Sequence, residues 1–343
     1  MIHSRARRGR PTALLAVTLA TGLALAACGS DSSSGGGGDA KSVNLVAYSV
    51  PKPAYDALAT AFAATSQGAG VKVNSSYGAS GTQATAVTNG QKADVVNFSV
   101  GSDMSKLVPG KVAEDWNTGP TKGIVSASVV VIATRPGNPK GIEGWDDLIK
   151  PGVQIVTPDP ASSGSAKWNI LAAYTHVLKN GGTEEAAKTY LTAYYKNIVS
   201  KPSSGAQATS TFLNGTGDVL ISYESEAIGG KQKGDKFDYV VPDESFLIET
   251  PAAVTKNASQ AAKDFLAYAE SDAGQKIFAS KGFRPALEGV DPGTVEGAND
   301  PAHPYPAVAK LTTIGDLGGW SEVNKKYFDK KDGIVTQIAS SVG

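Results

Sequence analysis

"SVNLVAYSVPKPAYDALATAFAAT", residues 42–65, predicts a β-strand followed by an amphipathic helix. Its first nine residues have a strand pattern, whereas apolar side chains recur at helical spacing from residue 54 onward. The order then repeats, because a strand pattern over residues 71–78 precedes a helix pattern over 81–91 and a short buried strand over 93–100. Since strands and helices alternate, we expect an α/β fold with mainly parallel sheets.

Two later runs are long and strand-like. Residues 125–139 are continuous and β-branched, and residues 237–255 have a strand pattern over a similar length. We expect two α/β lobes joined by these long strands, near residues 127–134 and 240–254. A shorter strand is predicted over residues 218–226, and a helix over residues 260–280. A body of roughly 300 residues is long enough for two domains.

The N-terminus has the features of an export signal. Four arginines precede an apolar run, and "LAAC" at residues 25–28 ends with Cys28, the only cysteine of the chain. Small residues before such a cysteine are typical of bacterial lipoprotein signals. We therefore predict a signal peptide over residues 1–27 and lipid attachment at Cys28. An ordinary secreted protein with an unpaired thiol is the alternative.

Residues 28–41 are rich in Gly and Ser and are predicted to form a flexible tether. A tether after a lipid anchor places the body on the extracytoplasmic face of the cell membrane. No later run has the about 20 apolar residues needed to span a bilayer. Of the 32 basic and 32 acidic residues, four arginines lie in residues 1–27, so the mature chain has 28 basic and 32 acidic residues. This net charge of −4 disfavours a nucleic-acid partner, whose recognition relies on clustered Lys and Arg.

Three predicted helices begin with small, uncharged residues. The starts are "SYGASGTQ" (residues 76–83), "SSGSAKWN" (162–169) and "PSSGAQATSTF" (202–212). A helix start presents unpaired backbone N–H groups and the positive end of the peptide dipoles, which together favour an anion. In α/β sheets such turns lie at the carboxyl ends of strands, where ligands bind. Each start alone is an ordinary cap, but three of one kind could converge on one anion.

Five segments of the chain carry a family resemblance. In order, they are "SYGASGTQATAVTNGQKADVV", "IEGWDDLIKPGVQIVTPDPASSGSAKWN", "SGAQATSTFLNGTGDVLISYESEA", "GFRP" and "IGDLGGW". Together they resemble the periplasmic sulfate-binding proteins of bacterial ABC importers, most closely the lipid-anchored versions of Gram-positive bacteria and mycobacteria. The resemblance implies a two-lobed periplasmic-binding-protein fold of type II, with mainly parallel sheets flanked by helices and a hinged cleft.

The resemblance also implies a domain division and a role. One lobe would comprise residues 42–126 plus 248–295, and the other residues 127–247 plus 296–343. The protein would be a monomeric receptor without cofactor, metal or enzymatic activity. It would capture sulfate or thiosulfate between its lobes and deliver it to an ABC permease with its ATPase.

The family's ligand site is nearly uncharged and consists of hydrogen-bond donors. These are backbone N–H groups at helix starts, one Ser hydroxyl and one Trp indole, and the Ser at the "GASG" turn gives both hydroxyl and amide. The matching motifs place these contacts on Ser49, Ser80, Gly164, Ser165, Ala206 and Tyr223.

Three of these positions depart from the family pattern. Ser49 replaces a common Asp, which is tolerable if only its amide is used, and Ser165 replaces the second Gly of a paired-glycine turn. Tyr223 stands where many members have an indole, and a phenol can accept as well as donate. A donor-only pocket rejects protonated phosphate, because a buried unpaired O–H costs about 1–3 kcal/mol. Tyr223 therefore leaves molybdate or phosphate open as alternatives to sulfate.

Two other function classes stay open, a surface hydrolase and a structural lipoprotein. Hydrolysis needs a base beside a nucleophile, and the mature chain offers only His176, predicted inside a helix, and His303, predicted in a loop. The acids nearest to the proposed pocket are Glu224 and Glu226, and a strand there would turn Glu224 to the face opposite Tyr223. Four more residues are predicted to be structural. Arg284 is predicted to form a salt bridge within a lobe, and three tryptophans are predicted to pack in the core: Trp145, Trp168 and Trp320.

Overall fold

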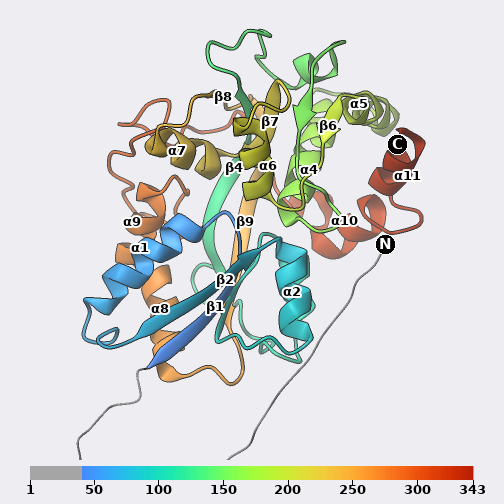
Figure 1. The fold of residues 1–343 in the computed structure, drawn as a ribbon. Helices are drawn as coiled ribbons and strands as arrows, with labels where there is room; N and C mark the ends of the chain where they lie inside the picture. Colours follow the sequence, from blue (N-terminus) through green and yellow to red (C-terminus); the bar gives the residue numbers. More distant parts are fainter. Residues whose placement is uncertain (1–40, 343) are drawn as a thin grey trace, which may run out of the picture. The chain divides into compact units, whose positions relative to one another are not determined.

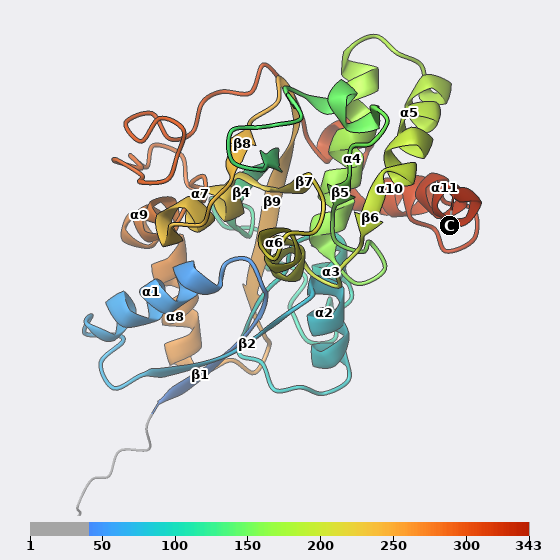
Figure 2. The same cartoon turned by 45° about the horizontal axis from the view of Figure 1, so that its top comes forward.

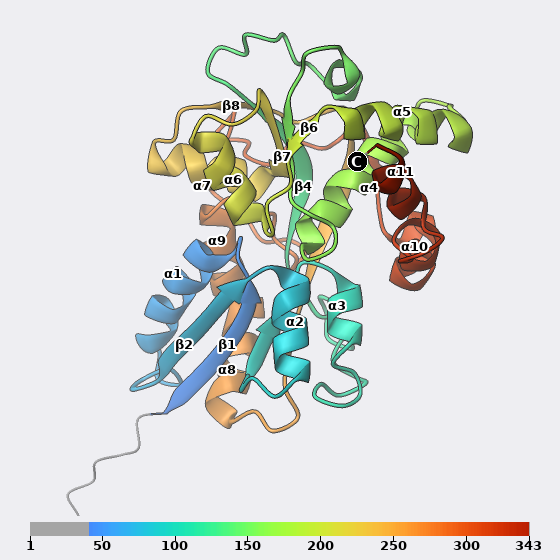
Figure 3. The same cartoon turned by 45° about the vertical axis from the view of Figure 1, so that its right-hand side comes forward.

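The computed structural model describes residues 41–342. The predicted signal peptide, Cys28 and all of the predicted tether except Lys41 lie outside the described residues. Within residues 41–342, two α/β lobes are joined by two long strands (Figures 1 and 3). No helix in this range has the length and apolar character needed to cross a membrane. The residue-by-residue lobe boundaries stay predictions.

Three parallel strands form the sheet of the first lobe. β1 (Ser42–Tyr48) pairs with β2 (Lys72–Gly78) on one side and with β3 (Val95–Asn97) on the other. The apolar side chains of β1 are buried because helices cover the sheet, as in most parallel sheets. The helices around this sheet are α1 (Lys52–Ala63), α2 (Ser80–Thr88), α3 (Gly101–Ser105), α8 (Gln260–Glu270) and α9 (Asp272–Ser280).

The second lobe is also built around parallel strands. β5 (Ile155–Val156) pairs with β6 (Ile198–Ser200) and with β7 (Val219–Tyr223). Its other elements are β8 (Asp238–Val240), β10 (Lys310–Thr312), α4 (Gly164–Lys179), α5 (Glu184–Lys196), α6 (Gly205–Leu213), α7 (Glu224–Lys233), α10 (Gly319–Tyr327), α11 (Ile334–Val342) and the 3-10 turns η1 (Trp145–Ile149) and η2 (Gly315–Leu317). The C-terminal helix α11 lies beside α5 (Figure 2).

The two long strands are β4 (Ile124–Thr134) and β9 (Glu244–Val254), close to the predicted positions. They pair antiparallel with Val129 opposite Leu247, while β9 also pairs with β3 and β4 with β7. The resulting strand order is β2-β1-β3-β9-β4-β7-β5-β6, with β10 beside β9 and β8 beside β4. Pairing within each lobe is mainly parallel, as predicted. The connecting strands are antiparallel to each other because they pass between the lobes in opposite directions.

The strand predicted over residues 218–226 is too long. β7 ends at Tyr223 and α7 begins at Glu224. The prediction that Glu224 lies on a strand face opposite Tyr223 is therefore wrong. A helix is favoured here because Glu224 and Glu226 lie in its first turn and two lysines lie in its last turn, the arrangement that the helix dipole prefers.

Two other predicted elements are each divided. Residues 237–255 form β8 and β9, because Pro242 lies between them and has no N–H for strand pairing. Residues 260–280 form α8 and α9, because the Ser271 hydroxyl accepts from the Gly274 amide and caps a new helix. The short helix α3 was not predicted, and it carries a residue of the candidate site.

Candidate functional site

The three predicted helix starts lie beside one another. α2, α4 and α6 begin where predicted, and no acidic residue occurs in their first turns. The Gly81 amide donates to the Ser162 carbonyl at 3.1 Å, which joins the starts of α2 and α4. A Cβ atom added to Gly205 would lie 3.0 Å from the Ser165 Oγ atom, so the starts of α4 and α6 are also in contact. The sequence elements that could converge on one anion are thus brought together.

The backbone N–H groups of the predicted amide contacts have no hydrogen-bond partner within residues 41–342. They are the amides of Ser49, Ser80, Gly164, Ser165 and Ala206, and the first-turn amides of Thr82, Ala166 and Gly205 have none either. The residues at the starts of α2 and α4 are buried, with exposed fractions of 2% for Ser80 and 3% for Ser165. Buried backbone N–H groups are nearly always paired. This group of donors is therefore suited to bind a ligand that carries several oxygen acceptors.

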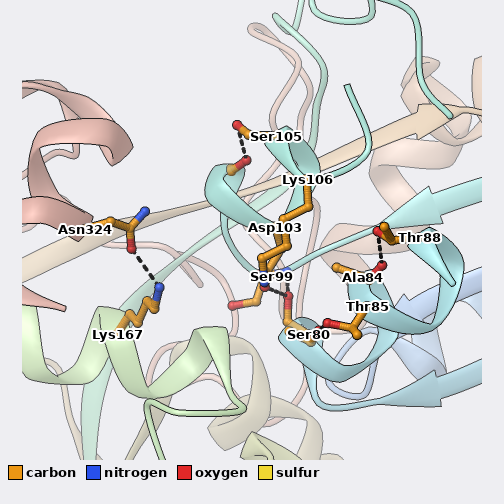
Figure 4. Close-up of polar contacts among 12 residues, drawn as sticks. Ser80, Ala84, Thr85, Thr88, Ser99, Asp103, Ser105, Lys106, Lys167 and Asn324 are labelled. Atoms are coloured by element: carbon orange, nitrogen blue, oxygen red, sulfur yellow. Dashed lines mark hydrogen bonds and ion pairs between the residues drawn. The ribbon is translucent and has the colours of Figure 1, made fainter. Parts of the chain in front are cut away.

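The Ser80 hydroxyl belongs to a buried network (Figure 4). It donates to Asp103 Oδ2 at 2.6 Å and accepts from the Ser99 amide at 3.0 Å. Asp103 lies on α3 and also accepts from Lys106 Nζ at 2.6 Å. The sequence analysis missed this carboxylate, although its place just after a predicted strand was the available signal. An acceptor thus lies within hydrogen-bond distance of a predicted donor.

The Tyr223 side chain is buried at the end of β7. Its hydroxyl lies 2.7 Å from Ser99 Oγ, and either oxygen can be the donor. Burial raises the pKa of the Tyr223 phenol, so the phenol keeps its proton at neutral pH. The Trp168 indole donates to the Ser99 carbonyl at 2.8 Å. Ser99, which was not predicted, therefore connects Ser80, Tyr223 and Trp168.

A glycine is required where α4 meets Ser99. A Cβ atom added to Gly164 would lie 2.7 Å from both Ser99 Cβ and Ser99 Oγ, closer than real Cβ contacts come. The start of α4 therefore approaches the end of β3 so closely that a side chain would not fit. This close approach places the start of α4 against the Ser99 side chain, whose hydroxyl is bonded to Tyr223.

A cavity of about 470 Å³ adjoins the helix starts and includes Ser49 and Ala206 in its wall. Three lysines also line it, Lys52, Lys233 and Lys281. Two acidic residues, Glu226 and Asp235, line the same cavity. Glu226 accepts from Ser222 Oγ at 2.8 Å and from Thr209 Oγ1 at 3.1 Å.

The Glu226 carboxylate lies close to the helix starts. A Cβ atom added to Gly205 would be 3.1 Å from its Oε2 atom. Burial raises the pKa of Glu226 by more than the Ser222 and Thr209 hydroxyl groups and the charge of Lys233 together lower it. Glu226 was predicted only as one of the two acids nearest to the pocket, and the structure places it in the cavity wall.

The remaining residues singled out in the sequence have structural contacts. Arg284 forms a salt bridge with the buried Glu224, with Nε–Oε2 and Nη2–Oε1 distances of 2.7 and 2.9 Å. His176 lies in α4 and packs against Trp145 and Tyr190. The Trp145 indole donates to the Glu244 carbonyl, and Trp320 packs against Trp168. The exposed His303 lies beside Asp300.

Comparisons with known proteins agree with this arrangement. Residues 43–284 match the sequence model of a family described as bacterial extracellular solute-binding protein. The chain is 41% identical to a sulfate-binding protein of Synechococcus elongatus, with 91% of each chain covered. It is 34% identical to a thiosulfate-binding protein of Pseudomonas aeruginosa, over 86% of this chain and 91% of that one. Among solved structures, the sulfate-binding protein SubI from Mycobacterium tuberculosis is similar with a TM-score of 0.79 and 44% identity, covering 84% of this chain and all of that chain.

Proposed function

Because this chain belongs to the bacterial extracellular solute-binding proteins, we propose that it captures sulfate between its two lobes and delivers it to an ABC importer. The importer would consist of a membrane permease and its ATPase. Relatives named for sulfate and for thiosulfate support this ligand class. Thiosulfate is a close variant of the same tetrahedral dianion.

One observation carries the proposal: the amides of Ser49, Ser80, Gly164, Ser165 and Ala206 have no protein partner among the described residues. A tetrahedral oxyanion offers several lone pairs in different directions, as such a set of donors requires. The Tyr223 hydroxyl would add one side-chain donor, and the Ser80 hydroxyl would add a second by turning its single proton from Asp103 to the ligand. The ligand contacts would thus be Ser49, Ser80, Gly164, Ser165, Ala206 and Tyr223.

An uncharged site of this kind binds tightly enough for a receptor. A hydrogen bond to a charged partner contributes about 1.5–3 kcal/mol, so about six would contribute roughly 10–18 kcal/mol before the costs of desolvation and lobe closure. Micromolar affinity needs only about −8 kcal/mol. Permanent cations at the contact positions are not required.

The protonation state of the ligand would decide the selectivity. Sulfate has no proton at neutral pH, so it only accepts and matches donors alone. Hydrogen phosphate also carries an O–H that needs an acceptor. Asp103, 2.6 Å from Ser80 Oγ, and Glu226 in the cavity wall are two carboxylates that could supply one. This observation keeps phosphate as the second candidate ligand.

A binding role fits the surroundings of Ser80 better than a hydrolytic one. A serine nucleophile needs a base to remove its proton. The candidate base within hydrogen-bond distance of Ser80 Oγ is the Asp103 carboxylate, which is already ion-paired with Lys106 at 2.6 Å. The two histidines of the described chain contact other residues, His176 in α4 and His303 beside Asp300.

The place of the protein in the cell would follow from its N-terminus. We propose that lipid attached to Cys28 holds a monomeric body on the outer face of the cell membrane, and that the Gly- and Ser-rich segment leaves this body free to meet the permease. Mass spectrometry of the protein extracted from membranes checks the lipid. A diacylglyceryl mass on the peptide that begins at Cys28 is expected, and an unmodified thiol there would contradict it.

Equilibrium dialysis with radiolabelled sulfate tests the ligand. Saturable binding of one sulfate per chain, displaced by thiosulfate and not by hydrogen phosphate, is expected. Displacement by hydrogen phosphate at equal concentration would favour the second candidate. No retention of sulfate, phosphate or molybdate would contradict the receptor function.

A further inference from the structure

Five exposed lysines lie along one edge of the sheet of the first lobe. At this edge the parallel strands β1, β2 and β3 begin, and β9 ends, because it runs antiparallel to β3. None of the five ammonium groups has an ion-pair partner within residues 41–342. The five residues, which we name the lysine edge, are Lys41, Lys72, Lys92, Lys111 and Lys256.

Backbone hydrogen bonds fix the neighbours along this edge. The Lys72 amide donates to the Lys41 carbonyl at 2.8 Å, and the Lys256 amide donates to the Lys111 carbonyl at 2.8 Å. The Thr255 amide donates to the carbonyl of Asp94, two residues after Lys92, at 2.9 Å. The lysines therefore occupy neighbouring positions on rigid elements, although they are far apart in the sequence.

Three of these lysines surround one hollow. A cavity of about 380 Å³ is lined by Lys92, Lys111 and Lys256 together with main chain and small polar residues. The one acid in its wall, Asp94, is buried and accepts from the Asn44 amide at 2.8 Å and from Asn44 Nδ2 at 2.6 Å. The solvent-facing charge of the hollow is therefore positive.

Acidic residues are few in the loops at this edge. Residues 64–71 carry no charge, and residues 255–260 carry only Lys256. The loop that contains Lys111 carries two exposed acids, Glu114 and Asp115. Asp264 lies nearby on α8 and shares a small pocket with Lys41. The mature chain as a whole is acidic, so attraction to a negative surface is concentrated at this edge.

We propose that the lysine edge binds the headgroups of anionic phospholipids and holds the first lobe against the membrane surface. The occupant is a membrane because the chain enters the described body at Lys41, on this same edge, and the preceding 40 residues contain the predicted lipid anchor and tether. Clustered lysines next to a membrane-attached segment are a known means of binding anionic lipids.

This orientation leaves the anion site away from the lipid surface. The helix starts follow the carboxyl ends of the strands, whereas the lysine edge lies at their beginnings (Figure 3). The first lobe would therefore lie on the membrane surface with the ligand site facing the solvent. The proposal concerns orientation only and does not depend on which anion the site binds.

Co-sedimentation with vesicles tests the lysine edge. The mature chain from residue 28 carrying Cys28→Ser, which has neither the predicted signal peptide nor a lipid, is mixed with vesicles of phosphatidylglycerol and phosphatidylcholine (1:1) and with pure phosphatidylcholine vesicles. We expect binding to the anionic vesicles only, weakened at least tenfold by the triple variant Lys92→Gln, Lys111→Gln, Lys256→Gln and by raising the salt concentration. The matched control Lys201→Gln, Lys236→Gln, Lys325→Gln removes three exposed lysines elsewhere and should change binding less than threefold.

Each outcome decides the proposal. If vesicle binding weakens equally in the two triple variants, the effect is one of general charge and the proposal is overturned. Equal binding to both kinds of vesicle, or binding to neither, would also overturn it. Sulfate affinity is measured on the same variants by calorimetry. An unchanged value in the Lys92, Lys111 and Lys256 variant shows that the fold is intact, and it separates failure of this proposal from failure of the receptor function.

Discussion

The hydroxyl groups of Tyr223 and Ser99 lie 2.7 Å apart and join the end of β7 in one lobe to the residues after β3 in the other. Both side chains are buried, with exposed fractions of 0%. Ser99 also holds the Ser80 hydroxyl through its amide and the Trp168 indole through its carbonyl. The contact between the lobes and the proposed ligand site therefore share the same residues.

Removing the Tyr223 hydroxyl should weaken sulfate binding. Tyr223→Phe takes away one donor, worth about 1 kcal/mol, so the Kd should rise roughly fivefold. Isothermal titration calorimetry measures the change. The control is Tyr174→Phe, because the Tyr174 hydroxyl is buried without a partner in the described chain and lies outside the proposed contacts. Equal affinities for Tyr223→Phe and the parent would remove Tyr223 from the site.

Ser80→Ala should have a similar or larger effect. Without ligand, the Ser80 hydroxyl donates its single proton to Asp103 at 2.6 Å. The variant removes this proton, which would turn to the ligand on binding, and leaves Asp103 without its donor. We expect at least a fivefold rise in the sulfate Kd, since a lost donor costs about 1 kcal/mol or more. Ser105→Ala is the control, because that exposed hydroxyl donates only to the Gly101 carbonyl. The assigned role of Ser80 is wrong if both variants bind sulfate as the parent does.

The helix starts could be predicted from the sequence because their signals are local. Small residues after a strand pattern identified the beginnings of α2, α4 and α6, and the long strands were evident from β-branched runs. Ser99 and Asp103 were missed because their roles depend on the approach of α4 and α2 to the end of β3, which no local pattern encodes. The position of Glu226 in the cavity wall was not predicted for a related reason: the chain changes from strand to helix after Tyr223, and Glu226 lies in the first turn of that helix.

Gly164 should not tolerate a side chain. In Gly164→Ala the new methyl group would be forced against Ser99, at 2.7 Å from its Cβ and Oγ atoms. Overpacking of this kind typically costs about 1–3 kcal/mol, so thermal unfolding should occur several degrees lower and sulfate binding should weaken. Gly144→Ala is the control, because nothing lies within 4 Å of a Cβ atom there. Equal melting temperatures for the two variants would contradict the close contact.

The salt bridge between Arg284 and Glu224 should give a pH-dependent stability. Burial raises the pKa of Glu224 while Arg284 lowers it, so Arg284→Met should raise that pKa further. Leaving the buried carboxylate unpaired should lower the free energy of unfolding by about 3–5 kcal/mol at pH 7.5.

The sign of the pH effect follows from the raised pKa of Glu224. A folded-state pKa above the unfolded value means that the folded state binds the proton more tightly, so stability is gained as the pH falls through the folded pKa. Urea unfolding should therefore show that Arg284→Met lowers the free energy of unfolding less at pH 5 than at pH 7.5. The double variant Glu224→Gln, Arg284→Met should lose this pH dependence. An equal decrease in the free energy of unfolding at both pH values would contradict the raised pKa of Glu224.

The ligand itself gives the most direct test of the receptor function. Isothermal titration calorimetry of the ligand-free protein at pH 8 compares sulfate with hydrogen phosphate. We predict one sulfate site per chain with a Kd in the micromolar range or tighter, and binding of hydrogen phosphate at least 100-fold weaker. Sulfate that produces no saturable heat, or phosphate that binds as tightly as sulfate, would contradict a site built from hydrogen-bond donors alone.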